Sequence, residues 1–246
     1  MKWVGIHHNF HYSALSECES NAHDYLGNTA LLIAIDAGQM ESVKILLKHS
    51  EWHLNQKNKS EETPLHVACK KGHTEILTEL IHAHFDINAT DDLGNTPLFY
   101  ANSLSSTLLL FNGAHLNWQN DSGLSAFLFH IQQGRLDVAS QFIRLPDLDF
   151  ELQDAGNRNC LHFCAFRGYL EIAQEILSQT RLNLNSATRR GNTALHAAAE
   201  AGHSEMVRFL LKSGADPTLR NAQGRSAADL CRNDDIKSLL HGKLSV

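Results

Sequence analysis

One segment of this 246-residue chain recurs seven times at a nearly constant spacing, and this repeat constrains the fold more than any other feature. Each copy carries an apolar residue or alanine two places after a Thr- or Ser-type position. These residues, Leu31, Leu65, Leu98, Phe127, Leu161, Leu195 and Ala228, lie 34, 33, 29, 34, 34 and 33 positions apart. A period near 33 over seven copies is typical of a solenoid, in which one small unit stacks on the next.

The copy GNTALHAAAEAGHSEMVRFLLKSGAD shows what one unit contains. The hydroxyl of Thr193 can accept from an amide in the first helical turn, and Pro64 and Pro97 fill the next position in two sister copies, where a missing N–H costs nothing. Gly202 ends the first helix, and Glu205 suits the positive end of a second one. The sequence therefore predicts a helix, a turn, a second helix and a loop in each copy.

Four short motifs within the copies resemble the ankyrin repeat. They are TPLH at Thr63–His66, TALH at Thr193–His196, GH at Gly72 and at His203, and GAD at Gly214–Asp216. The resemblance covers roughly residues 24–241. It implies helix pairs joined by β-turn fingers, with the fingers and first helices lining a concave face. The fold class is accordingly identified as an all-α ankyrin-repeat solenoid of about six to seven repeats, including the terminal ones.

The register divides the chain into three parts. Residues 1–23 are interpreted as an N-terminal cap segment and residues 242–246 as a tail. Between them lies the array of residues 24–241, with repeats starting near 24, 58, 91, 120, 154, 188 and 221. In the last copy Ala228 and Asp229 replace the Leu and His of the motif, which suits a C-terminal cap, because a terminal repeat must expose one of its faces.

The third repeat is four residues short. Alignment with the sister copies places the loss between Asn102 and Leu108, at the turn between the two helices. We therefore expect a local change of stacking between residues 92 and 134. His130 lies in this region, at a position where other copies carry a small core residue, and it needs a hydrogen-bond partner within the stack if it is buried. The alternative is a partner-facing or pH-sensitive histidine.

Composition argues against several other classes of protein. The apolar runs are far shorter than the roughly 18 residues that span a bilayer, and the N-terminus does not read as a signal peptide. The five cysteines are scattered and odd in number, so we expect reduced thiols and a cytoplasmic protein, or host cytoplasm if the chain is secreted. The net charge of -6 does not suggest nucleic acid as a partner, although all 11 arginines lie beyond residue 134.

Histidines and cysteines near the N-terminus offer one alternative function. His7 and His11 would share a helical face, and Cys18 or His23 could complete a metal site or a Cys–His pair. We nevertheless expect no enzyme activity, no catalytic residue, no metal and no cofactor, because about 23 residues are too few to bury a catalytic site on their own. Two further cysteines, Cys160 and Cys164, fall at core positions and are interpreted as buried thiols.

The family resemblance also implies where a partner protein would bind. Carried over position by position, it selects the fingertips and the exposed end of the first helix, where the arginines would form a basic stripe suited to an acidic peptide or protein surface. We expect a monomeric adaptor or scaffold, or, as a variant, an effector of an intracellular bacterium that binds a host protein. The selected residues are Tyr25, Leu26, Leu93, Leu124, Arg158, Phe166, Arg167, Arg189, Arg190 and Arg225.

Overall fold

The computed structural model describes residues 22–48 and 56–242 and divides the chain into two compact units, residues 1–85 and 86–246. The described residues form short helices and connecting loops, without a β-strand beyond two isolated bridges, Gln119 with Ser125 and Arg220 with Ser226. This confirms the predicted all-α repeat solenoid. None of the described helices combines the length and the apolar character needed to cross a bilayer.

Unit 1 contains two helix pairs. The first pair is α1 (Ala30–Asp36) and α2 (Met40–Lys48), and the second is α3 (Pro64–Lys71) and α4 (Thr74–His82). Each pair is preceded by a finger, and the two fingers are joined by a backbone hydrogen bond of 3.0 Å from the Lys59 amide to the Leu26 carbonyl.

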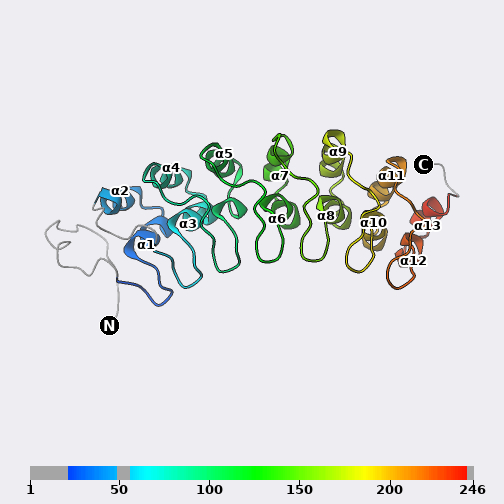
Figure 1. Cartoon of the computed structure of the whole chain (residues 1–246), viewed down its shortest axis with the longest axis horizontal. Helices are drawn as coiled ribbons and strands as arrows, with labels where there is room; N and C mark the ends of the chain where they lie inside the picture. Colours follow the sequence, from blue (N-terminus) through cyan, green and yellow to red (C-terminus); the bar gives the residue numbers. More distant parts are fainter. Residues whose placement is uncertain (1–21, 49–55, 243–246) are drawn as a thin grey trace. The chain divides into compact units, whose positions relative to one another are not determined.

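Unit 2 contains the remaining repeats. First helices and second helices form two rows, and the fingers project beyond the first helices (Figure 1). The first helices are the 3₁₀ helix η2 (Pro97–Phe99), α6 (Ala126–Gln133), α8 (Cys160–Arg167), α10 (Ala194–Ala201) and α12 (Ala227–Leu230). The second helices are α5 (Ser103–Phe111), α7 (Leu136–Ile143), α9 (Leu170–Gln179), α11 (Ser204–Lys212) and α13 (Asp234–Leu240).

The helix boundaries follow the predicted capping chemistry. The Thr193 hydroxyl caps α10, and Gly202 ends it with φ of +81°. His196 adds a second function at the same helix start. Its Nδ1 accepts from the Thr193 amide at 3.2 Å, so Nε2 carries the proton and donates to the Arg225 carbonyl in the next finger at 3.1 Å. One neutral histidine therefore both closes the start of a helix and links two successive repeats.

The last repeat uses a carboxylate for the first of these tasks. Asp229 stands at the histidine position of α12, and its Oδ2 accepts from the Ser226 amide at 2.8 Å and from the Ser226 hydroxyl at 2.9 Å. These hydrogen bonds lower the pKa of Asp229. A carboxylate has no N–H to donate, so Asp229 cannot make the link to a following carbonyl that His196 makes.

The core consists of leucines and small residues on facing sides of the helix rows. Leu195, Ala198 and Ala199 of α10 are buried, as are Val207 and Leu210 of α11. Alanines at the contact let neighbouring helices approach closely, so successive repeats pack without large gaps. The cysteines at equivalent core positions behave in the same way, since Cys160 and Cys164 are both fully buried, as predicted.

Backbone hydrogen bonds join each fingertip of unit 2 to the next, and we call this row the fingertip ladder. In each case the amide of a tip residue donates to a carbonyl of the preceding tip. The four bonds run from Asp121 to Leu93 (3.2 Å), from Ala155 to Ser122 (2.8 Å), from Arg189 to Gly156 (2.9 Å) and from Ala222 to Arg190 (3.0 Å). The tips are therefore held at a fixed order and spacing by main-chain contacts that do not depend on their side chains.

The shortened repeat has lost its residues from the first helix. α5 has nine residues, as α4 and α11 do, whereas η2 has only three. Asn102 is the N-cap of α5 and accepts from the Ser105 amide at 2.8 Å, in the place that His203 occupies before α11. The predicted location of the loss, between Asn102 and Leu108, is therefore wrong. The second helix keeps its length because Ser105, Ser106 and Leu109 must reach the core.

His130 makes up for the missing helical turn. A full-length first helix would satisfy the Leu98 carbonyl with the amide four residues later, but that residue is Asn102, which has extended backbone. His130 Nε2 instead donates to this carbonyl at 3.0 Å. The imidazole is fully buried and packs edge-on against Phe142, at a position where α10 has Ala198. The predicted hydrogen-bond partner within the stack is confirmed.

The environment of this imidazole opposes its protonation. Burial is the main cause, the nearby charge of Arg135 acts in the same direction, and the Leu98 carbonyl and Asp137 only partly oppose it, so the pKa of His130 falls to about 4. Nδ1 is buried and has no hydrogen-bond partner among the described residues. A second proton would therefore go to Nδ1, where no described group accepts a hydrogen bond from it.

Acid should destabilise the chain through this residue. Because the folded-state pKa lies below the unfolded value of roughly 6.5, the contribution is complete above pH 6.5 and is lost as pH falls toward 4. In His130→Gln, whose amide can still donate to Leu98, the loss of unfolding free energy between pH 7 and pH 5 should be about 2 kcal/mol smaller than in the wild type. Urea unfolding followed by circular dichroism measures this. An equal loss in both proteins would contradict it.

Two glycines in neighbouring fingers test the ladder. Gly191 (φ +76°) and Gly224 (φ +71°) share a left-handed conformation, so alanine should cost about 1–2 kcal/mol at either position. At Gly191 the new Cβ would also lie 2.6 Å from the Ala222 amide nitrogen, whereas at Gly224 it meets nothing within 4 Å. Gly191→Ala should therefore lower the unfolding free energy by roughly 1–3 kcal/mol more than Gly224→Ala. Urea unfolding at pH 7 compares them, and equal losses would show that the ladder contact contributes nothing.

Candidate protein-interaction surface

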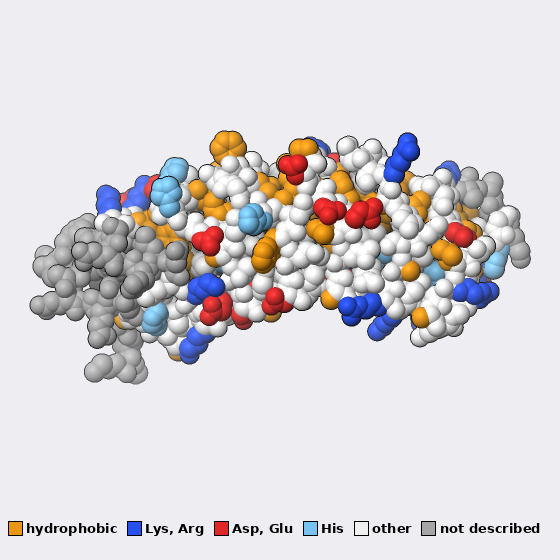
Figure 2. Space-filling model, in the orientation of Figure 1, with side chains coloured by type: hydrophobic (Ala, Val, Ile, Leu, Met, Phe, Trp, Pro, Cys, Tyr) orange, Lys and Arg blue, Asp and Glu red, His pale blue; other side chains and the backbone are white. Residues whose placement is uncertain are grey.

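The fingers form one exposed edge of unit 2 (Figure 1). They project away from both helix rows, and side chains of both charge signs lie along this edge (Figures 1 and 2). Figure 2 shows basic side chains at the finger end of the segment between α8 and α12. The conformation of each finger therefore determines which side chains a partner could contact.

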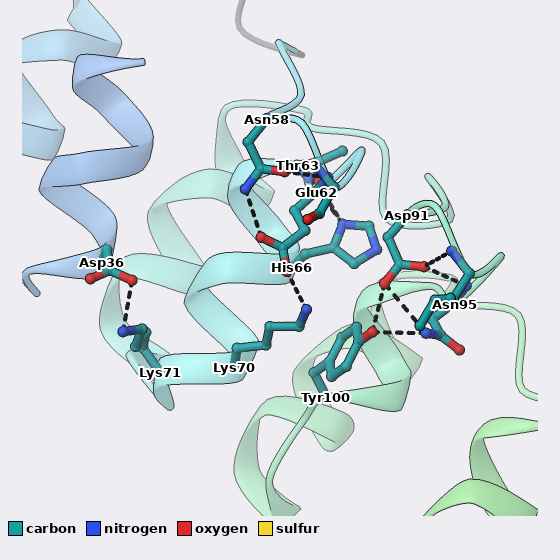
Figure 3. A network of polar contacts seen from close by, with 12 residues as sticks. Asp36, Asn58, Glu62, Thr63, His66, Lys70, Lys71, Asp91, Asn95 and Tyr100 are labelled. Carbon is teal, nitrogen blue, oxygen red and sulfur yellow. Dashed lines mark hydrogen bonds and ion pairs between the residues drawn. The ribbon is translucent and has the colours of Figure 1, made fainter. Parts of the chain in front are cut away.

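A side-chain-capped turn fixes the conformation of each tip. In the finger before η2, Asp91 Oδ1 accepts from the Leu93 amide at 3.0 Å and the Asn95 amide at 2.9 Å, and Oδ2 accepts from the Tyr100 hydroxyl at 2.6 Å (Figure 3). Burial alone would raise the pKa of Asp91, but these hydrogen bonds outweigh it and hold the pKa below its ordinary value. Asp92 and Leu93, at the tip, are left to project into solvent.

The same turn recurs in three more fingers of unit 2, whereas in the finger before α10 the Thr188 hydroxyl accepts from one amide only, that of Asn192 at 3.2 Å. The residue at the base of the turn accepts from two amides of its own tip, which consumes its side chain and leaves the tip residues exposed. These base residues are Asn120, Asp154 and Asn221, with Oδ1 distances of 2.8–3.0 Å. The tip positions selected from the sequence thus lie on a preorganised backbone.

Acidic and apolar side chains lie together on the fingers before η2 and α6. Asp92 and Asp121 are exposed, and Leu93 exposes 59% of its surface. Trp118, which sequence reasoning missed, exposes 42%, and its indole Nε1–H donates to the Gly94 carbonyl at 2.9 Å. The indole is therefore held against the preceding finger. Its signal in the sequence is a large aromatic ring two places before the turn, where Ala89 and Ser186 occupy the equivalent positions.

Arginines lie on the fingers before α10 and α12. Arg189, Arg190 and Arg225 are exposed, and none of them forms an ion pair with a described residue. The Arg225 guanidinium donates to the Gln223 side chain, which is neutral. The positive charge of these fingers is therefore not neutralised within the described part of the chain.

Two of the selected residues are engaged within the molecule. Leu124 is 7% exposed, because its amide and carbonyl both pair with Asn120 and the turn directs its side chain inward. The structure therefore does not place Leu124 at the surface. Arg158 is exposed, but it bonds Asp154 at 2.7 Å and 2.5 Å and lies 4.7 Å from the centre of the Phe163 ring. Its charge is largely neutralised. GNRNCLH has one residue more between its glycine and Leu161 than GNTALH has before Leu195, which predicts a bulge in this finger, and this prediction is wrong. Asn157 (φ +58°) takes the left-handed position that Gly94 takes in its finger, and the Asp154 amide bonds the Arg158 carbonyl at 3.0 Å as in a turn of ordinary length.

The end of α8 carries the next two selected residues. Phe166 exposes 56% of its surface. Arg167 is exposed and donates to the Gln132 carbonyl of the preceding first helix at 3.2 Å. His203 contacts the Phe166 carbonyl in the same way, at 3.1 Å. These contacts anchor the end of α8 and leave the Phe166 ring free.

Unit 1 presents apolar tips, and its lysines are occupied. Tyr25 and Leu26 expose 81% and 49% of their surface. Lys59 donates to the Tyr25 carbonyl at 2.7 Å, Lys70 pairs with Glu62, and Lys71 lies 2.7 Å from Asp36 (Figure 3). Lys70 and Lys71 are therefore neutralised by carboxylates, whereas Lys59 donates to a neutral carbonyl.

Chemically reactive groups are sparse in the described part of the chain. Burial raises the pKa of the Cys160 thiol to about 12 and also raises the pKa values of Cys69 and Cys164, so none of them is a ready thiolate. The described residues contain no group of three His, Cys, Asp or Glu side chains that could hold a metal ion. His7, His11 and Cys18 lie outside the described residues, and His23 is exposed with Nδ1 3.1 Å from the Gly27 carbonyl.

Curated relatives match parts of larger proteins. Alpha-latrotoxin-Lg1a of Latrodectus geometricus is 30% identical over 184 residues, covering 72% of this chain and 13% of the toxin. The human transient receptor potential cation channel subfamily A member 1 is 29% identical over 63% of this chain and 18% of its own length. Mouse NF-kappa-B inhibitor zeta is 26% identical over 89% of this chain and 32% of its own. The chain thus spans less than a third of these relatives.

Solved structures match the fold over most of both chains. The ankyrin repeat domain of Bcl-3, a member of the IkappaB protein family, superposes with a TM-score of 0.74 at 24% identity and covers 88% of this chain and 99% of that domain. The human ASB11 ankyrin repeat domain gives 0.77 at 22% identity, with 89% and 99% covered. A family model described as ankyrin repeats matches residues 6–91, 50–120 and 127–221. The chain belongs to the ankyrin-repeat family.

Proposed function

We propose that this chain is a non-enzymatic protein-interaction module, acting as an adaptor or scaffold through its fingers and first helices. The observation that carries the proposal is a row of rigid fingertips whose exposed charges, apart from that of Arg158, form no ion pair within the described chain. Exposed arginine and aromatic side chains on a preorganised backbone are the usual centres of protein interfaces, because little ordering is needed on binding. NF-kappa-B inhibitor zeta, a relative of this chain, is by its name directed at another protein.

The arginine fingers favour an acidic partner surface. Arg189, Arg190 and Arg225 lie on two successive fingers that the ladder joins through the Ala222 amide and the Arg190 carbonyl, at 3.0 Å. A guanidinium group binds a carboxylate through two parallel hydrogen bonds, which a lysine cannot reproduce. Three such groups in fixed relation would select closely spaced carboxylates on a protein or peptide.

We place this activity in a cytoplasm and in a monomer, as the sequence predicts. Burial of the described cysteines suits a compartment in which thiols stay reduced. The variant in which the chain is an effector delivered by an intracellular bacterium uses the same surface and differs only in the origin of the partner.

Charge reversal in one finger tests the proposal. A partner captured from a cell lysate and identified by mass spectrometry should lose roughly tenfold or more of its affinity for Arg189→Glu/Arg190→Glu, because each change replaces attraction by repulsion. Isothermal titration calorimetry with the purified partner measures the dissociation constant.

A matched control separates this effect from a general change of charge. Arg181→Glu/Lys212→Glu alters the net charge by the same amount, but in the loop after α9 and at the end of α11, away from the fingertips, and should bind normally. Both variants should keep the thermal unfolding midpoint within a few degrees of the wild type. Full binding by the Arg189→Glu/Arg190→Glu variant would show that the arginine fingers are not the interface.

A further inference from the structure

We propose that the fingertip ladder of unit 2 binds one extended partner segment with segregated charge, basic and apolar at one end and acidic at the other. This inference rests on the proposed function and adds to it the chemistry and the direction of the bound segment. It follows from three observations on the described residues: the order of the charges, the position of the apolar side chains and the reach of the ladder.

The exposed charge reverses once along the ladder. The first two fingers carry Asp92 and Asp121, and neither forms an ion pair with a described residue. The middle finger is nearly neutral, because the Arg158 guanidinium contacts Asp154 at 2.5 Å. Beyond it come Arg189 and Arg190 and then, one finger later, Arg225. A uniformly acidic segment would be repelled at one end of this row, and a uniformly basic one at the other.

An apolar site accompanies the acidic end. Leu93 and Trp118 are exposed there, and the 2.9 Å hydrogen bond from the indole to Gly94 holds the ring across two fingers. The Leu93 carbonyl accepts from Asp121, so the leucine and that carboxylate belong to tips in direct contact. A lysine or arginine can place its charge beside the carboxylates and its aliphatic stem on the indole, where the ring face also favours a cation. The acidic end is thus selective for a basic residue next to an apolar one.

The ladder is long enough to separate the two ends and short enough for one segment to reach both. Stacked helix pairs lie roughly 10 Å apart, so the four steps from the first of these fingers to the last span about 40 Å. An extended chain advances about 3.3 Å per residue and covers this length with about 12 residues. The main-chain bonds of the ladder keep the order of the fingers fixed, so the charge order in the segment determines its direction.

Peptide selection against the full chain tests this inference. Displayed random peptides of about 16 residues, slightly longer than the estimated span, are selected on the wild type at low salt and eluted with salt. Enriched peptides should carry Lys or Arg beside an apolar residue in one half and Asp or Glu in the other. Fluorescence anisotropy of a synthetic consensus peptide should show at least tenfold weaker binding when the order of its two halves is exchanged.

Two charge-reversal variants identify which end of the ladder binds which half of the peptide. Selection on Asp92→Lys/Asp121→Lys should turn the basic half of the consensus acidic and leave the other half unchanged. Selection on Arg189→Glu/Arg190→Glu should change only the acidic half. Glu171→Lys/Glu205→Lys on the second helices α9 and α11 matches the first variant in charge and should return the wild-type consensus.

The outcomes distinguish this inference from the proposed function. Peptides that compete with one another for the arginine fingers but are uniformly acidic, or that bind equally well with their halves exchanged, would overturn the segregated-charge inference and leave the interaction surface in place. Enriched peptides whose binding is unaffected by every finger variant would overturn both. A consensus whose two halves respond separately to the two variants supports both.

Discussion

Hydrogen bonds between successive repeats hold the fingers in line, and the proposed interaction surface depends on this alignment. A single helix pair cannot bury both of its faces, so each repeat is ordered by its neighbours. The imidazole of His196 shows the coupling directly. It accepts a hydrogen bond from the Thr193 amide at the start of its own helix and donates one to the Arg225 carbonyl in the next finger. The backbone carbonyl of Arg225, whose side chain would contact a partner, is therefore held by the preceding repeat.

The shortened repeat shows how much such a stack tolerates when the backbone groups remain satisfied. Loss of four residues from a first helix leaves the Leu98 carbonyl without its helical donor. It also leaves unfilled the volume of one helical turn. His130 addresses both, because its ring occupies a position that Ala198 fills elsewhere and its Nε2 reaches the Leu98 carbonyl. The remaining cost is electrostatic, since the imidazole must stay neutral. The deletion is thus absorbed within two adjacent repeats, and the fingers before and after it keep their ladder contact.

Properties that follow from local chemistry could be read from the sequence. The helix start at Thr193, the end at Gly202 and the burial of Cys164 each depend on one repeat in a known register. Properties that depend on contacts between repeats could not. Alignment had no reason to assign the lost residues to the first helix, because the second helix is kept by burial of Ser105 and Leu109. Nor could it show that Asn120 turns Leu124 inward, or that Trp118 is held against Gly94 in the neighbouring finger.

The same separation of core and tip explains how opposite charges can share one surface. Side chains at the tips contribute little to the stack, because the turns are closed by base residues such as Asp91 and the ladder is made of main-chain atoms. Asp92 and Arg189, at equivalent positions, can therefore differ freely while the backbone beneath them stays the same. On a globular surface of similar size, side chains of opposite charge could lie close enough to form ion pairs with each other. On a row of fingers they are kept several repeats apart, and an extended partner segment of the kind proposed can neutralise both at once.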